Sequence, residues 1–147
     1  MFGVKDETHL PTSTIAFRPE WIPLSGHHLW HCGVHFDAVR AQGVLGEQFA
    51  LQLIERAAPD PGPVVCEAKG FRWTYFLLPP GTARQYPWPV GVQWFSGKRT
   101  VAYIGVPALT GNTWPLLWYS RPTRAAPFVD PKTLHNVMDP AGPIPRL

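Results

Sequence analysis

Charged residues are scarce in this sequence, and long apolar runs are missing. Asp, Glu, Lys and Arg make up 16% of the chain, whereas hydrophobic residues make up 45%. This balance excludes a disordered tail and indicates a globular protein with a substantial core. The longest apolar stretches reach about six residues, far short of the roughly 20 that a membrane-spanning helix needs. We therefore expect the 147 residues to form one soluble domain.

Cysteine is nearly absent, and the start of the chain lacks the marks of an export signal. The two cysteines, Cys32 and Cys66, both fall in predicted strands. Residues 1–11 have neither the basic start nor the apolar run of a signal peptide. We therefore expect a cytoplasmic protein whose cysteines are reduced thiols, and not a disulfide.

The net charge of the chain is small. The formal net charge is +3, with nine arginines against four lysines. This mild basic excess permits an anionic partner without requiring one.

The pattern of apolar residues and turn signals predicts an α+β domain. Alternation over Trp30–Asp37 is typical of a half-buried strand, and Gly43–Ala58 has the periodicity of a helix. Asp130 and Pro131 have the residue types of an N-cap and a first helical position, so a short helix should follow. Between the two helices, turn signals separate five predicted strands: Val64–Ala68, Trp73–Leu78, Val90–Phe95, Val101–Val106 and Leu116–Ser120.

These elements should form a single mixed or antiparallel sheet with one main helix and one short C-terminal helix on the same face. The dipeptide Ser96-Gly97 favours a tight hairpin between two of the strands. We expect an extended lead-in over residues 1–29, held to the body by Trp21 and Ile22. The domain should span residues 30–138, and a proline-rich tail should cover residues 139–147.

Four of the six histidines lie between Gly26 and Asp37. On the predicted strand His31, His35 and Asp37 share one face, which suggests a site for a divalent ion or zinc. Cys32 would point to the opposite face, and His28 would have to fold back to join them. The alternative interpretation is a strand with a buried thiol and histidines at its surface. In the same way, Asp37 could act as a catalytic acid or form a local salt bridge or cap beside Arg40.

A second group of residues interleaves cations with aromatic rings. Such patterns are typical of proteins that bind single-stranded nucleic acid, because phosphates meet the charges while bases stack on the rings. Alternatively, the seven tryptophans belong to the core or to a protein interface. The candidate residues for binding nucleic acid or a partner are Lys69, Arg72, Trp73, Tyr75, Arg84, Trp94, Lys98 and Arg99.

Several segments resemble motifs of one enzyme family. They are Cys32–Asp37, Gly70–Phe76 with Pro79–Thr82, and Tyr103–Pro107 with Trp118-Tyr119. Over roughly residues 30–138 the chain resembles the primase-polymerase (archaeo-eukaryotic primase-like) domain of bacterial bifunctional DNA primase/polymerase proteins. Such domains carry an acidic pair at a strand end, a histidine on a later strand and a third acidic residue. The resemblance implies an α+β fold related to the RNA-recognition motif.

The chain departs from this family at the positions that carry its chemistry. His35 stands at the first acidic position, Asp37 at the second, and Gly91 or Gln93 near the third. Trp73 replaces the histidine that would contact the nucleotide phosphate. Because a lone carboxylate cannot hold two magnesium ions, the resemblance implies a catalytically degenerate domain.

The sequence therefore predicts an accessory module without a resident cofactor. Its partner would be a protein or single-stranded nucleic acid and not a membrane, and homo-oligomers are left open. The alternative is an enzyme that processes phosphoesters, with Asp37 and His35 as catalytic groups and His31, His35 and Asp37 around one ion.

Overall fold

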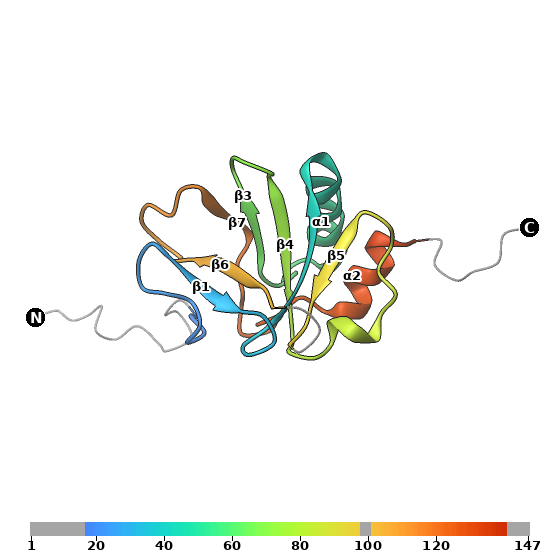
Figure 1. The fold of residues 1–147 in the computed structure, drawn as a ribbon, viewed down its shortest axis with the longest axis horizontal. Coiled ribbons are helices and arrows are strands. Elements are labelled where there is room, and N and C mark those ends of the chain that lie inside the picture. Colours follow the sequence, from blue (N-terminus) through green and yellow to red (C-terminus); the bar gives the residue numbers. More distant parts are fainter. Residues whose placement is uncertain (1–16, 98–100, 141–147) are drawn as a thin grey trace, which may run out of the picture.

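The computed structural model describes residues 17–97 and 101–140, which form seven strands, two α-helices and a short 3₁₀ helix. Figure 1 shows the arrangement of these elements. The strands are β1 (His27–His31), β2 (Asp37–Gln42), β3 (Val64–Glu67), β4 (Trp73–Leu78), β5 (Val92–Phe95), β6 (Tyr103–Pro107) and β7 (Leu116–Ser120). The helices are α1 (Gly43–Ala57), η3 (Ala83–Gln85) and α2 (Pro131–Met138).

The strands form two antiparallel sheets. The larger sheet has five strands in the order β5-β2-β4-β3-β7, and the smaller is a two-stranded ribbon of β1 and β6. In Figure 1 the ribbon lies on one side of the five-stranded sheet, and α1 and α2 lie on the other. The α+β class, the antiparallel pairing and the placement of both helices on one face are as the sequence predicts.

The sheet separates two apolar clusters, because successive residues of a strand point to opposite faces. On β2, Val39 joins the cluster under α1 and α2, whereas Ala38 joins the cluster under the ribbon. On β4, Phe76 and Leu77 divide in the same way. Both faces of the central strands are therefore buried along part of their length.

The expected strand over Trp30–Asp37 is wrong, because the chain bends between β1 and β2. The Gly33 N–H donates to the Phe36 carbonyl at 2.6 Å, and Gly33 has a φ of 95°, which favours glycine. Val34, which the alternation would bury, is 62% exposed. Apolar residues on both sides of a bend can imitate a period of two, so the pattern alone hid the break.

The expected single sheet and the Ser96-Gly97 hairpin are also wrong. That dipeptide does connect β5 to β6, but β5 pairs with β2 whereas β6 pairs with β1. The bend before β2 carries β1 out of the plane of the large sheet. β6 follows it, and the Cys32 N–H extends the pairing by donating to the Ala102 carbonyl at 2.9 Å.

Both helices are confirmed, and the start of α2 has a clear cause. Helix α1 begins at Gly43 as expected and ends one residue early, at Ala57. Helix α2 begins at Pro131 after the expected N-cap, since the Asp130 carboxylate accepts from the Thr133 N–H at 2.9 Å. In the part of the chain that the structure describes, neither helix has the length and apolarity to cross a membrane.

The segment before the expected domain boundary is partly structured. Trp21 and Ile22 are buried as expected, with Trp21 stacked on Phe128 and tilted against Phe36. Strand β1 begins at His27, inside the segment that the sequence assigns to an extended lead-in.

Candidate functional site

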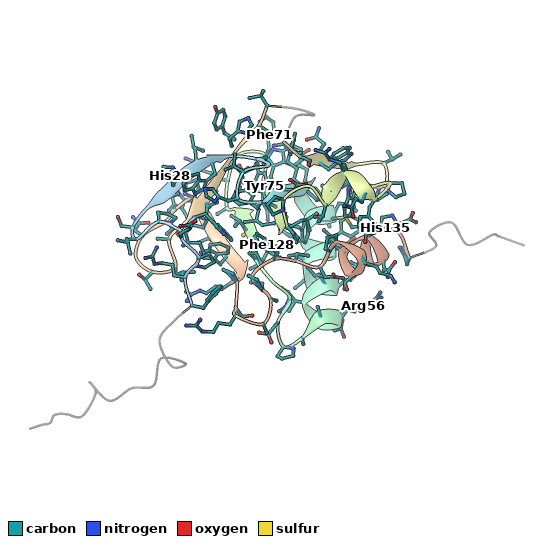
Figure 2. The ribbon with its side chains drawn as sticks, turned by 90° about the horizontal axis from the view of Figure 1, so that it is seen from below. His28, Arg56, Phe71, Tyr75, Phe128 and His135 are labelled. Carbon is teal, nitrogen blue, oxygen red and sulfur yellow. The ribbon has the colours of Figure 1, made fainter. Side chains whose placement is uncertain are left out.

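Three of the four histidines between Gly26 and Asp37 pack against aromatic rings, at two separate places. His28 and His35 flank Trp30, with ring centroids 4.3 and 4.5 Å from its own. His31 lies against Tyr103, its register partner on β6, at 5.3 Å. In Figure 2 His28 lies on the ribbon, far from His135 of α2.

Asp37, the third predicted metal ligand, lies inside the core. It is fully buried, and its Oδ2 accepts from the Ala83 N–H at the start of η3 at 3.0 Å. Asp37 shares the helix side of β2 with Val39, so it points away from Arg40 and forms no salt bridge with it. The structure therefore does not bring His31, His35 and Asp37 together. Across residues 17–97 and 101–140, no three His, Cys, Asp or Glu side chains are grouped closely enough to hold a metal ion.

Cys32 is buried, as the sequence predicts, and it lies in the core beneath the ribbon. Its surroundings do not activate it as a nucleophile. Its pKa is raised to about 12, first by burial and then by the negative charge of Asp37, while Arg40 lowers it. Because the thiolate is the reactive form, Cys32 is an inert thiol near neutral pH.

The most distinctive polar group on the helix-free face of the sheet is a set of side chains centred on one arginine, here called the Arg40 cluster. Its members come from three adjacent strands, and Gln93, Arg40 and Tyr75 are direct register partners on β5, β2 and β4. They share a face with Ala38 and Leu77. Tyr75 is a buried member of the apolar cluster beneath the ribbon, and Trp73 and Phe95 pack against that cluster. The Arg40 cluster consists of Arg40, Trp73, Tyr75, Gln93 and Phe95.

Aromatic rings and hydrogen bonds fix the Arg40 guanidinium. Its Cζ lies 3.8 Å from the Trp73 ring centroid, 5.0 Å from that of Phe95 and 5.9 Å from that of Tyr75. The Arg40 Nε donates to Gln93 Oε1 at 2.7 Å, and Nη1 donates to the Tyr75 hydroxyl at 3.3 Å. No ion pair of Arg40 occurs among the described residues. The cluster therefore holds a full positive charge at a partly exposed surface.

Among the described residues, the neighbours of Arg40 leave its positive charge uncompensated. Burial raises the pKa of Tyr75, and the hydrogen bond from Arg40 lowers it, so the phenol is neutral near pH 7. Glu67 of β3 directs its carboxylate to the Trp73 N–H at 3.2 Å and not to Arg40.

The structure brings only some of the sequence-predicted binding residues together. Trp73 and Tyr75 belong to the Arg40 cluster, and Lys69 is exposed in the turn before β4. Trp94 packs against the cluster beneath the helices, on the other face of the sheet. Arg84 is exposed on η3, with Nη2 3.5 Å from Ser96 Oγ. Lys98 and Arg99 lie outside the described residues.

Arg72 has a structural partner of its own. It forms an ion pair with Glu47 of α1, and its backbone is left-handed, with a φ of 56°. Its carbonyl accepts from the Gly43 N–H at 3.0 Å, which ties the turn before β4 to the start of α1. Arg72 also lines a cavity of about 240 Å³ beside Cys66, whose pKa is raised mainly by burial.

Sequence reasoning missed Arg40, Gln93 and Phe95 as members of a site. Arg40 is the one cation in the run Ala38–Ala41, and the sequence pattern indicates only that it lies near Asp37. Its meaning depends on strand register, because Gln93 and Tyr75 become its neighbours only when β5 and β4 pair with β2.

Comparison of the chain with models of protein families, with curated proteins and with solved structures finds no match.

Proposed function

We propose that this chain is a binding module that holds single-stranded nucleic acid on the Arg40 cluster. The observation that carries the proposal is the Arg40 guanidinium stacked 3.8 Å from the Trp73 ring centroid, with no ion-pair partner in the described part of the chain. Arginine held on an aromatic platform serves both components of a nucleotide. Its charge attracts phosphate, and the partly exposed rings of Trp73 and Phe95 offer stacking surfaces for bases.

Exposed residues beside the cluster extend this surface. Phe71 is 70% exposed, and its ring centroid lies 6.4 Å from that of Trp73. Lys69 is exposed in the same turn. A strand of nucleic acid that crosses the open end of β4 would therefore meet an exposed ring, an exposed cation and the cluster. Stacking on one ring contributes about 1 to 3 kcal/mol per base, so few contacts suffice for measurable binding.

The buried position of Asp37 supports a binding role over nucleotidyl transfer. In the resemblance to primase-polymerases, Asp37 is the one acidic residue that remains. Its carboxylate is fully buried and accepts from the Ala83 N–H on the helix side of the sheet, whereas the Arg40 cluster lies on the opposite side. A nucleotide on the Arg40 cluster is thus separated from Asp37 by the sheet. We propose a primase-polymerase-like domain whose catalytic centre has been lost and whose sheet surface binds nucleic acid.

The test is binding of a fluorescein-labelled single-stranded oligonucleotide, measured by anisotropy over a range of salt concentrations. We expect binding at low salt that weakens about tenfold or more in Arg40→Ala and in Trp73→Leu. Arg40→Ala should also reduce the slope of log K against log salt by about 0.7, the contribution of one phosphate contact. Arg40→Lys should keep this slope but bind more weakly, because lysine lacks the planar fork.

The matched control is Arg56→Ala, which removes the same charge from an exposed position on α1. Figure 2 shows Arg56 on the helical side of the molecule. This variant should bind like the wild type. Thermal unfolding of each variant verifies that the fold is kept. Absence of binding by the wild type at low salt, or an equal loss in Arg56→Ala, contradicts the proposal and leaves a protein contact as the use of this surface.

A further inference from the structure

We infer that the Arg40 cluster reads the edge of a base and prefers guanine, an inference that rests on the proposed function. The groups that the cluster presents to a ligand are hydrogen-bond donors. A partner that satisfies them must supply acceptors.

The amide of Gln93 has a fixed orientation. The Arg40 Nε–H donates to Gln93 Oε1 at 2.7 Å. The flipped amide would place its NH₂ group against this N–H, with two donors facing each other. The carbonyl therefore points to Arg40, and the Gln93 Nε2 is left as a donor at an exposed position on β5.

Arg40 adds further donors in a fixed plane. Its Nη1 is used by the Tyr75 hydroxyl, whereas Nη2 has no hydrogen-bond partner among the described residues. A guanidinium has no acceptor atom. Because the guanidinium lies over the Trp73 ring and makes two hydrogen bonds, its N–H groups are oriented before a ligand arrives, which lowers the entropy lost on binding.

Guanine has an edge that matches paired donors. Its O6 and N7 atoms are both acceptors, and a bidentate contact from arginine to these atoms is the commonest specific base contact. Adenine places an amino group beside N7, so the same edge of adenine would set a donor against a donor. Cytosine is the competing base, because its O2 and N3 are also adjacent acceptors in a single strand. A phosphate also offers paired acceptors, but it would give binding without base preference.

The experiment compares oligo-dT strands that carry one central dG, dA, dC or 7-deaza-dG in competition for the wild-type protein. We expect the strand with dG to bind about tenfold tighter than that with dA, since a bidentate pair discriminates by one to two orders of magnitude. Tighter binding of the dC strand than of the dG strand would overturn the preference for guanine. Replacement of N7 by carbon in 7-deaza-dG should remove most of this preference while leaving every phosphate in place.

Gln93→Glu tests the role of the amide. The carboxylate can accept from Arg40 as Gln93 does, but it offers no donor, so the preference for dG should fall to within about twofold of dA. Gln52→Glu makes the same chemical change at an exposed position on α1 and should leave the preference intact. Equal affinity for all four strands, with binding still weakened by Arg40→Ala, overturns guanine reading but keeps the proposed function. No binding of any strand overturns both.

Discussion

At the scale of single residues, Gly33 has less room for a side chain than any other glycine in the described part of the chain, because it lies against Gly97. A Cβ atom on Gly33 would lie 2.2 Å from both the Cα and the N of Gly97. Gly97 itself has a φ of 35°. The bend that ends β1 is therefore packed backbone to backbone against the residue that leaves β5, and neither partner has a flexible side chain that could move aside.

Gly33→Ala should destabilise the protein by more than about 2 kcal/mol, because it adds both a steric clash and a residue with unfavourable φ. Urea unfolding measures this change. The control is Gly70→Ala, where φ is also positive but the space around the new Cβ is open, and the expected loss is about 1 kcal/mol. Equal losses in the two variants would refute the importance of the contact.

A second residue-scale consequence concerns Cys32 and alkaline pH. Its pKa is raised from 9.0 to about 12 in the folded protein. Between these values the unfolded chain releases the thiol proton while the folded chain retains it. The free energy of unfolding should therefore fall as pH rises above 9, by at most about 1.4 kcal/mol per pH unit from this group.

Cys32→Ala should flatten this decline, although it lowers stability at every pH by creating a cavity. Only the slope between pH 9 and pH 11 is compared, by urea unfolding of both proteins under the same conditions. Cys66, Tyr75 and Tyr119 also have raised pKa values, but they are common to both proteins. Parallel curves for variant and wild type would contradict the buried-thiol account.

At the scale of elements, β2 connects the two halves of the molecule. Its even-numbered residues supply Ala38 and Arg40 to the helix-free face, and its odd-numbered residues supply Asp37 and Val39 to the helix side. A one-residue slip of this strand would bury Arg40 beneath the helices and expose Val39. The Arg40 cluster therefore depends on the register of β2 with β4 and β5.

Helix α2 depends on its N-cap. Asp130 Oδ2 accepts from both the N–H and the hydroxyl of Thr133, at 2.9 and 2.7 Å. Asp130→Ala should lower the free energy of unfolding by about 1 kcal/mol. Thermal or urea unfolding measures the effect. Glu55→Ala, which removes a carboxylate from an exposed position on α1, should change stability by less than about 0.5 kcal/mol.

At the scale of the whole molecule, the five-stranded sheet and the ribbon differ in how many neighbouring strands and helices stabilise them. Strands β2 and β4 are each paired on both sides, whereas β1 and β6 pair with each other. The helices cover one face of the sheet, and the ribbon covers part of the other.

Native-state hydrogen exchange should separate these two parts. Amides of β2 and β4 should exchange only on global unfolding, whereas amides of β1 and β6 should exchange by a local opening of lower free energy. Mass spectrometry of peptides from each region under increasing urea provides the measurement. Identical exchange free energies in the ribbon and in β4 would show that the molecule unfolds as a single unit.

The sequence predicts where the helices and strands lie more accurately than it predicts which strands pair with each other. Periodicity located α1 and β4, and the pair Asp130 and Pro131 located the start of α2, because these signals are local. The choice of β1 as the partner of β6 depends on the bend at Gly33, which apolar residues on both sides conceal. The Arg40 cluster was out of reach for the same reason, since its members meet only through the pairing of β5, β2 and β4.

The Gly33 and Gly97 contact offers a means of recognising relatives of this protein. A Cβ at Gly33 would clash with the backbone of Gly97, whereas Gly97 is constrained by its own positive φ. Homologous chains should therefore keep Gly33 wherever this contact is kept, and should carry at position 97 glycine or another residue that tolerates a positive φ. This paired signature remains readable where overall similarity has faded, and it distinguishes an inherited fold from a chance likeness in the strands.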